Sequence, residues 1–233
     1  MNLQTYENSQ ELANALAQEI ASRMGRVLEK EGKVTIAVSG GTTPKLFLQQ
    51  LSKEKLDWKN VIVTLVDERW VDADKTESNE RFVRTHLLQN EAKNAWLVPL
   101  KTLDASVTDG YQATENRLSE ELNKIHFAVL GMGIDGHCAS WFPNSKALPI
   151  LLNDSTQARS YPVTDAPSFP ERLSLTWAFL AQCEQLYLHI EGAYKKDTLE
   201  KASVATELYK VNDMPVRKLI GQKTTPLTVF YCD

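Results

Sequence analysis

The sequence predicts an α/β protein in which a mainly parallel sheet lies between two layers of helices. Short apolar runs rich in β-branched residues alternate along the chain with segments whose apolar residues recur every three or four positions. The apolar runs are continuous, which is typical of strands covered on both faces. Strands that alternate with helices favour a parallel sheet, because parallel strands need a long crossover connection between them.

Five apolar runs are expected to form the strands. Each is short, and polar or glycine-rich segments separate it from its neighbours. In chain order they are KVTIAV (33–38), VIVTLV (61–66), FAVLG (127–131), LYLHI (186–190) and LTVFY (227–231). Ligands of such sheets bind at the carboxyl ends of the strands, so the segments that follow these runs are where a site is expected.

Helical periodicity is clearest near the N-terminus, where Ser9 is expected to cap a long helix with one buried stripe formed by Leu12, Leu16, Ile20, Met24 and Val27. Similar patterns predict helices over 108–124 and 193–203. Ser78 is expected to cap a helix that begins near Asn79. The proline-rich segment 155–170 is predicted to be a loop, and it is the only candidate internal boundary.

Composition narrows the classes of function. The 233 residues, 42% of them hydrophobic, suffice for one packed core, and we expect a single domain over 1–233. A net charge of −4 and the absence of a basic run argue against nucleic acid or a membrane surface as a partner. Three separated cysteines predict neither a disulfide framework nor a zinc site, and the polar N-terminus lacks signal-peptide features, so we expect a cytoplasmic protein.

The first strand is followed by SGGTTP, which has the features of an anion site. Gly40 and Gly41 allow close approach of the backbone to a ligand, Thr42 and Thr43 add hydroxyl donors, and Pro44 suits the first turn of a helix. A phosphate at such a helix start can accept backbone N–H bonds. An ordinary strand-to-helix turn is the alternative. The spacing is not that of an ATP-binding P-loop.

The second strand leads into Asp67, Glu68 and Arg69, so charged side chains appear at the predicted ligand edge of the sheet. A carboxylate and a guanidinium there could bind a polyol hydroxyl and a developing oxyanion. A solvated loop with a surface ion pair is the alternative interpretation.

The third strand leads into GMGIDGHCASWFPNS, whose glycines have the G-x-G-x-x-G spacing of dinucleotide-binding loops. Two features argue against that use. Pro143 comes too early for the long helix that a dinucleotide loop requires, and Asp135 places a carboxylate where a pyrophosphate would lie. The glycines are instead predicted to form a tight turn that presents Asp135 and His137. Histidine suits proton transfer near neutral pH, although a lone histidine is more often structural.

Two further cations follow later strands. Lys195, about one turn into the helix after Gly192, could reach a phosphate as a point charge, whereas a solvated surface lysine is the alternative. Arg172, in the segment RLSLT, is the second candidate.

Taken together and in order, SGGTTP, VDERWV with SNERFVRTHLL, GMGIDGHCASWFP, RLSLT and the G-x-x-K of GAYK resemble the 6-phosphogluconolactonase family over nearly the whole chain. The resemblance implies a three-layer, Rossmann-like α/β domain shared with glucosamine-6-phosphate deaminases. It also implies hydrolysis of 6-phospho-D-glucono-1,5-lactone to 6-phosphogluconate in the oxidative pentose phosphate pathway, without a metal or organic cofactor. The partner is then a small sugar-phosphate lactone, and the chain is expected to be a monomer or a small homo-oligomer.

The same resemblance assigns roles by motif. Gly40, Gly41, Thr42 and Thr43, with Lys195 and Arg172, would hold the phosphate, with Asp135 also among the substrate-binding residues. Asp67 and Arg69 would line the sugar-acid end, and His137 would be the general base. The chain departs from the usual family pattern at Cys138, Trp141 and the pair Ala193-Tyr194, which bears on loop packing.

Two alternatives remain at this stage. The first is a deaminase or isomerase of the same superfamily. By resemblance, such an enzyme is expected to carry further acid/base carboxylates after D-G-H, in a form such as A-F-N-E-P, and ASWFPN contains none. A non-catalytic sugar-phosphate sensor with this fold would normally carry an additional DNA-binding segment, which the sequence does not show.

Overall fold

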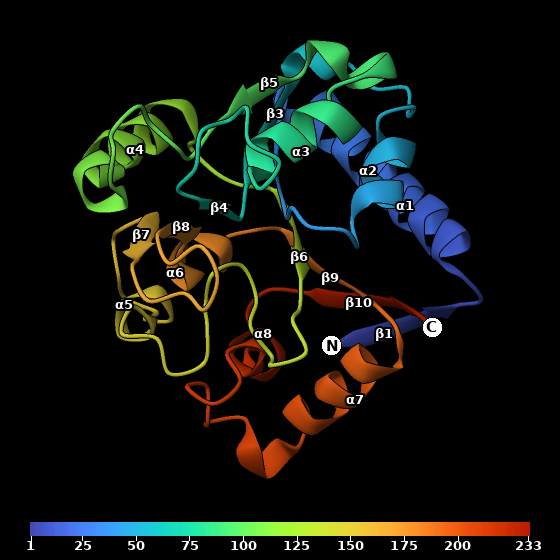
Figure 1. The fold of residues 1–233 in the computed structure, drawn as a ribbon. Coiled ribbons are helices and arrows are strands. Elements are labelled where there is room, and N and C mark those ends of the chain that lie inside the picture. Colours follow the sequence, from blue (N-terminus) through green and yellow to red (C-terminus); the bar gives the residue numbers. More distant parts are fainter.

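In the computed structural model, which describes residues 1–233, seven parallel strands form one sheet in the order β1-β10-β9-β6-β2-β3-β5 (Figure 1). All its neighbouring strands pair in parallel, which confirms the predicted type of sheet. The strands are β1 (Asn2–Tyr6), β2 (Val34–Val38), β3 (Val61–Leu65), β5 (Trp96–Val98), β6 (Phe127–Gly131), β9 (Gln185–Glu191) and β10 (Leu227–Cys232).

Helices cover both faces of this sheet, as the sequence predicts. Figure 1 shows α1 and α2 on one side of the strands and α7 and α8 on the other. The helices are α1 (Ser9–Glu31), α2 (Lys45–Leu51), α3 (Asn79–His86), α4 (Val107–Glu121), α5 (Leu148–Leu151), α6 (Trp177–Leu180), α7 (Ala193–Ala202) and α8 (Val216–Gly221), with short 3-10 turns at Trp58–Asn60, Asn90–Asn94 and Ala205–Glu207. No helix combines the length and apolar composition needed to cross a membrane.

The central strands and the long helix form the core in the way the apolar pattern predicts. Every residue of β2 is buried, and so is the predicted stripe of α1. The cap of α1 is Asn8, however, and the prediction of Ser9 as the cap is wrong. Asn8 has an extended backbone and its side chain accepts the N–H of Glu11, whereas the Ser9 hydroxyl donates to Glu191 at 2.6 Å. Both residue types suit a cap, so backbone conformation decided between them.

A second, antiparallel sheet was not predicted. It has the order β4-β8-β7, with β4 at Asp67–Arg69, β7 at Ser160–Val163 and β8 at Arg172–Leu175. The segment 155–170, predicted as a loop, therefore contains a strand. Pro162 does not prevent this, because β7 is an edge strand whose only neighbour is β8.

The register of the large sheet brings the predicted site segments together. Val38, the last residue of β2, pairs with Leu65 of β3 on one side and with Val129 of β6 on the other. Because β2 lies between β6 and β3, the segment SGGTTP leaves the sheet between the D-G-H loop and Asp67. The next strand beyond β6 is β9, which leads to α7 and Lys195.

Candidate active site

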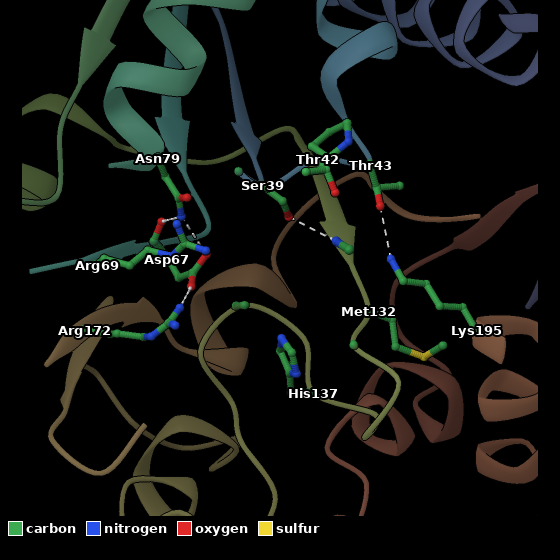
Figure 2. Close-up of a pocket in the computed structure, with 16 residues that line it drawn as sticks. Ser39, Thr42, Thr43, Asp67, Arg69, Asn79, Met132, His137, Arg172 and Lys195 are labelled. Atoms are coloured by element: carbon green, nitrogen blue, oxygen red, sulfur yellow. Dashed lines mark hydrogen bonds and ion pairs between the residues drawn. The ribbon is translucent and has the colours of Figure 1, made fainter. Parts of the chain in front are cut away.

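A cavity of about 250 Å³ lies at the carboxyl ends of the parallel strands, where the sequence predicts a site. Figure 2 shows that the side chains lining it come from segments far apart in the sequence. All but one of the predicted site residues line this cavity: Gly40, Gly41, Thr42, Thr43, Asp67, Arg69, His137, Arg172 and Lys195. The exception is Asp135.

The segment after β2 offers donors to an anion. The backbone N–H groups of residues 40–43 donate no hydrogen bond within the protein, and Gly41 has a left-handed backbone with φ +92°. Lys195 reaches this segment from α7, since its Nζ donates to Thr43 Oγ1 at 3.1 Å. Burial lowers the pKa of Lys195, while the charge of Glu191 acts in the opposite direction. Unpaired backbone donors beside an ammonium group are suited to a phosphate.

Gly40 is required by close packing. A Cβ at this position would lie 2.0 Å from Oδ1 of Asn79, far inside van der Waals contact. Asn79 is the first residue of α3 and is almost fully buried. The start of α3 therefore packs directly against the segment after β2.

The loop after β6 is a tight turn, not a dinucleotide loop. Gly133 N–H donates to the His137 carbonyl at 2.9 Å and Gly136 N–H to the Gly133 carbonyl at 3.0 Å. Gly136 has φ +81°, and a Cβ on Gly133 would lie 2.2 Å from His137 Nδ1. The next helix, α5, is four residues long and begins only at Leu148, so no long helix follows the glycines.

Asp135 lies behind His137. Its Oδ1 is 2.6 Å from His137 Nδ1 and also accepts the backbone N–H of His137. Burial raises the pKa of Asp135, but the hydrogen bond and charge of His137 outweigh this, and the net pKa is lowered. An ionised carboxylate can only accept, so Nδ1 carries the proton and the neutral ring keeps its lone pair on Nε2. The imidazole is thereby prepared to act as a base.

Asp67 is held from several directions. The carboxylate is buried and accepts hydrogen bonds from Ser140 Oγ at 2.5 Å and from Asn79 Nδ2 at 3.3 Å. It also forms an ion pair with Arg172, whose Nη1 lies 3.8 Å away. Neither Ser140 nor the side chain of Asn79 was among the predicted site residues. Asn79 follows Ser78 in the sequence, and Ser140 follows His137 by three residues. No periodicity or spacing in the sequence shows that these two side chains meet at one carboxylate.

The two arginines lie at the Asp67 end of the cavity. Figure 2 shows Arg172 and Arg69 near Asp67, and Lys195 near Thr43 on the other side. The carbonyl groups of Ser168 and Phe169 accept hydrogen bonds from the Arg172 guanidinium. Burial lowers the pKa of Arg172, whereas the charge of Asp67 acts in the opposite direction. Arg69 donates through Nη1 to the Glu77 carbonyl at 2.5 Å, and its buried Nε has no partner.

Glu68 points away from the cavity and fixes the start of α3. Its carboxylate is fully buried and accepts the backbone N–H groups of Arg69, Asn79 and Glu80 and the hydroxyl of Ser78. Burial raises its pKa to about 7, against the opposing effect of the backbone hydrogen bonds. The side chain of Ser78 also accepts the N–H of Arg81, which confirms it as the helix cap.

One cluster elsewhere has metal-ligand residue types. Glu31, His126 and Glu184 bring their ligand atoms within 4.8 Å of one another. His126 Nδ1, however, accepts the backbone N–H of Thr35 at 2.9 Å, so a neutral ring carries its proton on Nε2, which faces Glu31. Nε2 could bind a cation only if that proton and contact were lost, and the arrangement does not favour a metal.

Comparison with known proteins shows similarity over the full chain. A family model described as glucosamine-6-phosphate isomerases/6-phosphogluconolactonase matches residues 7–228. The chain is 36% identical over 231 residues to a 6-phosphogluconolactonase of Rhizobium meliloti, covering 99% of this chain and 98% of that protein. A crystal structure of a 6-phosphogluconolactonase from Shewanella baltica has a TM-score of 0.92 at 36% identity and covers 100% of this chain and 98% of that chain. A monomeric glucosamine-6-phosphate deaminase shares the fold, with a TM-score of 0.77 at 18% identity over 100% of this chain and 97% of its own.

Proposed function

The chain belongs to the family of glucosamine-6-phosphate isomerases and 6-phosphogluconolactonases, and we propose that it hydrolyses 6-phospho-D-glucono-1,5-lactone to 6-phosphogluconate with His137 as the general base. The observation that carries the assignment of the base is the short contact of His137 Nδ1 with Asp135, which leaves Nε2 free to take a proton. His137 lines the cavity and its side chain is about one-third exposed, so a water molecule can reach the ring.

The chemistry follows from this arrangement. His137 Nε2 takes a proton from a water molecule while the water oxygen forms a bond to the C1 carbonyl carbon. The carboxylate of Asp135 stabilises the imidazolium that results. When the tetrahedral intermediate collapses, the bond between C1 and the ring oxygen breaks and His137 returns the proton to that oxygen. Arg69 lines the cavity, and its guanidinium group is a donor for the oxyanion.

The phosphate occupies the opposite end of the cavity in this proposal. The free N–H groups of residues 40–43 and the ammonium group of Lys195 converge there. Charge-assisted bonds from several donors hold a dianion better than a single cation does. Arg172, which the sequence also suggests for the phosphate, lies instead beside Asp67, and we assign it to the sugar-acid end.

The cavity disfavours the deaminase reaction. Asp67 is the only carboxylate side chain that lines it, and Asp67 is already bonded to Ser140 and Asn79. The segment 139–144 after His137 contains no acid. Ring opening of an amino sugar with proton transfer between carbons needs additional acid/base groups, which this cavity does not supply.

The decisive experiment supplies two substrates separately. With freshly prepared 6-phosphogluconolactone we expect rapid proton release, recorded at constant pH against the spontaneous rate. With glucosamine 6-phosphate we expect no ammonia release. His137→Ala should lower the lactonase kcat by roughly 10² to 10⁴-fold, the range typical of a lost general base, while its thermal melt stays close to that of the wild type.

Ammonia release without lactone hydrolysis would reject the proposed reaction. Full lactonase activity in the folded His137→Ala variant would reject the base while leaving the reaction intact.

A further inference from the structure

A chain of buried side chains links the two ends of the cavity. We propose that Ser140, Asp67 and Asn79 act as a spacer that fixes the distance between the phosphate site and His137, and so selects a lactone whose phosphate lies at a set distance from its carbonyl. The proposal rests on the proposed function. It assigns Ser140 and Asn79 as positioning residues, since each acts through Asp67 and the loops it connects.

Ser140 connects this spacer to the base. It follows His137 by three residues and is fully buried, and its Oγ donates to Asp67 Oδ2 at 2.5 Å. The same short segment is attached to β8, because Ser140 N–H donates to Ser174 Oγ and Trp141 Nε1 donates to the Leu175 carbonyl at 2.9 Å. The loop that carries His137 is therefore held against both β4 and β8.

Asn79 connects the spacer to the phosphate end. Its Nδ2 donates to the Asp67 carbonyl at 2.9 Å and to the Asp67 carboxylate at 3.3 Å. Its backbone is fixed in turn, because Asn79 N–H donates to Glu68 at 2.7 Å. The Oδ1 atom lies 2.0 Å from where a Gly40 Cβ would stand, so Asn79 is packed against the first residue of the anion-binding segment.

Figure 2 shows Asn79 and Asp67 at one side of the cavity and His137 below them. Both oxygens of Asp67 accept hydrogen bonds from the protein, which suits a structural role better than proton transfer. The two hydrogen-bonded links, from Ser140 to Asp67 and from Asp67 to Asn79, join buried side chains, so the loss of either leaves a buried polar group without its partner.

The expected consequence differs between two substrates. A phosphorylated lactone is held at the phosphate while its carbonyl must meet His137, so an error in spacing misplaces the reacting carbon. Displacement of about 1 Å can cost roughly 10²-fold in rate. Unphosphorylated glucono-1,5-lactone lacks the second anchor and can shift to follow His137. Damage to the spacer should therefore reduce selectivity for the phosphorylated lactone.

The test measures kcat and KM for both lactones in Ser140→Ala, Asn79→Ala and the double variant. Each single change should lower the ratio of the two kcat/KM values by about tenfold or more, mainly through kcat for the phosphorylated lactone. In the double variant this ratio should fall little further than in either single variant, because both changes break the same spacer. Ser160→Ala is the matched control, since Ser160 is also fully buried and donates to a carboxylate, that of Glu115 at 2.6 Å, outside the cavity. It should leave the ratio unchanged.

Gly40→Ala tests the spacer from the phosphate end without removing a hydrogen-bonding group. Its Cβ must displace Asn79, so the ratio should fall as in Asn79→Ala. Equal loss on both lactones in the variants that melt like the wild type would overturn the spacer, and so would additive losses in the double variant. A wild type that does not hydrolyse the phosphorylated lactone would instead overturn the proposed function. Ser140→Ala, Asn79→Ala and Gly40→Ala all test the same spacer, so if one of them fails to fold the other two still test the proposal.

Discussion

At the scale of single residues, the sequence indicates His137 for a physical reason. It is the histidine that follows a strand directly within a glycine-rich loop, whereas His126 and His189 stand at strands. The sequence could not reveal what Asp135 does. Its contact with Nδ1 depends on a turn in which Gly136 adopts φ +81°, and periodicity carries no information on such a turn. Asp135 was predicted to bind substrate, and the structure places it outside the cavity lining.

Asp135→Asn separates these two roles. An amide can donate to Nδ1 through its nitrogen, which moves the ring proton to Nε2 and removes the base. We expect kcat for the phosphorylated lactone to fall by roughly 10²-fold or more, by analogy with other histidine–carboxylate pairs. KM should change little, because Asp135 does not line the cavity. Steady-state kinetics decide the matter: a large rise in KM with kcat preserved would show that Asp135 contacts substrate directly.

At the scale of elements, continuous apolar runs predicted the five buried strands because burial on both faces leaves a strong pattern. The remaining strands lack it. β1 is an edge strand without a buried residue, and β5 has three residues. β4 consists of Asp67, Glu68 and Arg69, and a charged triplet of this kind predicts a loop. These three residues form a strand because they pair with β8, a contact between distant parts of the chain that no local pattern encodes.

Burial of Glu68 at the start of α3 should make stability depend on pH. Its pKa is raised from 4.5 to about 7 in the folded protein, so the folded state holds a proton that the unfolded state releases. The resulting contribution to stability is present below about pH 4.5 and is lost as pH rises through 7. The shift corresponds to about 3 kcal/mol over that interval.

Glu68→Gln removes this titration. We expect the free energy of unfolding of the wild type, relative to that of the variant, to decrease by about 3 kcal/mol between about pH 4.5 and about pH 7.5. Urea denaturation at a series of pH values measures the difference. Glu120→Gln, at an exposed position of α4, is the control and should give a profile parallel to that of the wild type. A parallel profile for Glu68→Gln would show that folding does not raise the pKa of Glu68.

At the scale of the whole molecule, the charge of the site opposes the charge of the chain. The chain carries −4, yet Arg69, Arg172 and Lys195 line the cavity with Asp67 as the one carboxylate. The sequence indicated these residues singly, but only the order of the parallel strands and the pairing of β4 with β8 bring them to one cavity. A cationic cavity in an acidic protein attracts a phosphorylated ligand locally while the rest of the surface does not.

This contrast predicts how ionic strength affects the two lactones. Between about 0.01 M and about 0.15 M salt the Debye length falls from about 30 Å to about 8 Å, so attraction of the phosphate dianion weakens. We expect KM for the phosphorylated lactone to rise several-fold over this range, and KM for unphosphorylated glucono-1,5-lactone to stay nearly constant.

Lys195→Ala should raise KM for the phosphorylated lactone at low salt and reduce its salt dependence, because the ammonium group beside Thr43 is removed. Lys196→Ala is the matched control, since Lys196 is exposed and does not line the cavity. Similar salt dependence for both lactones would mean that the phosphate does not bind among these cations.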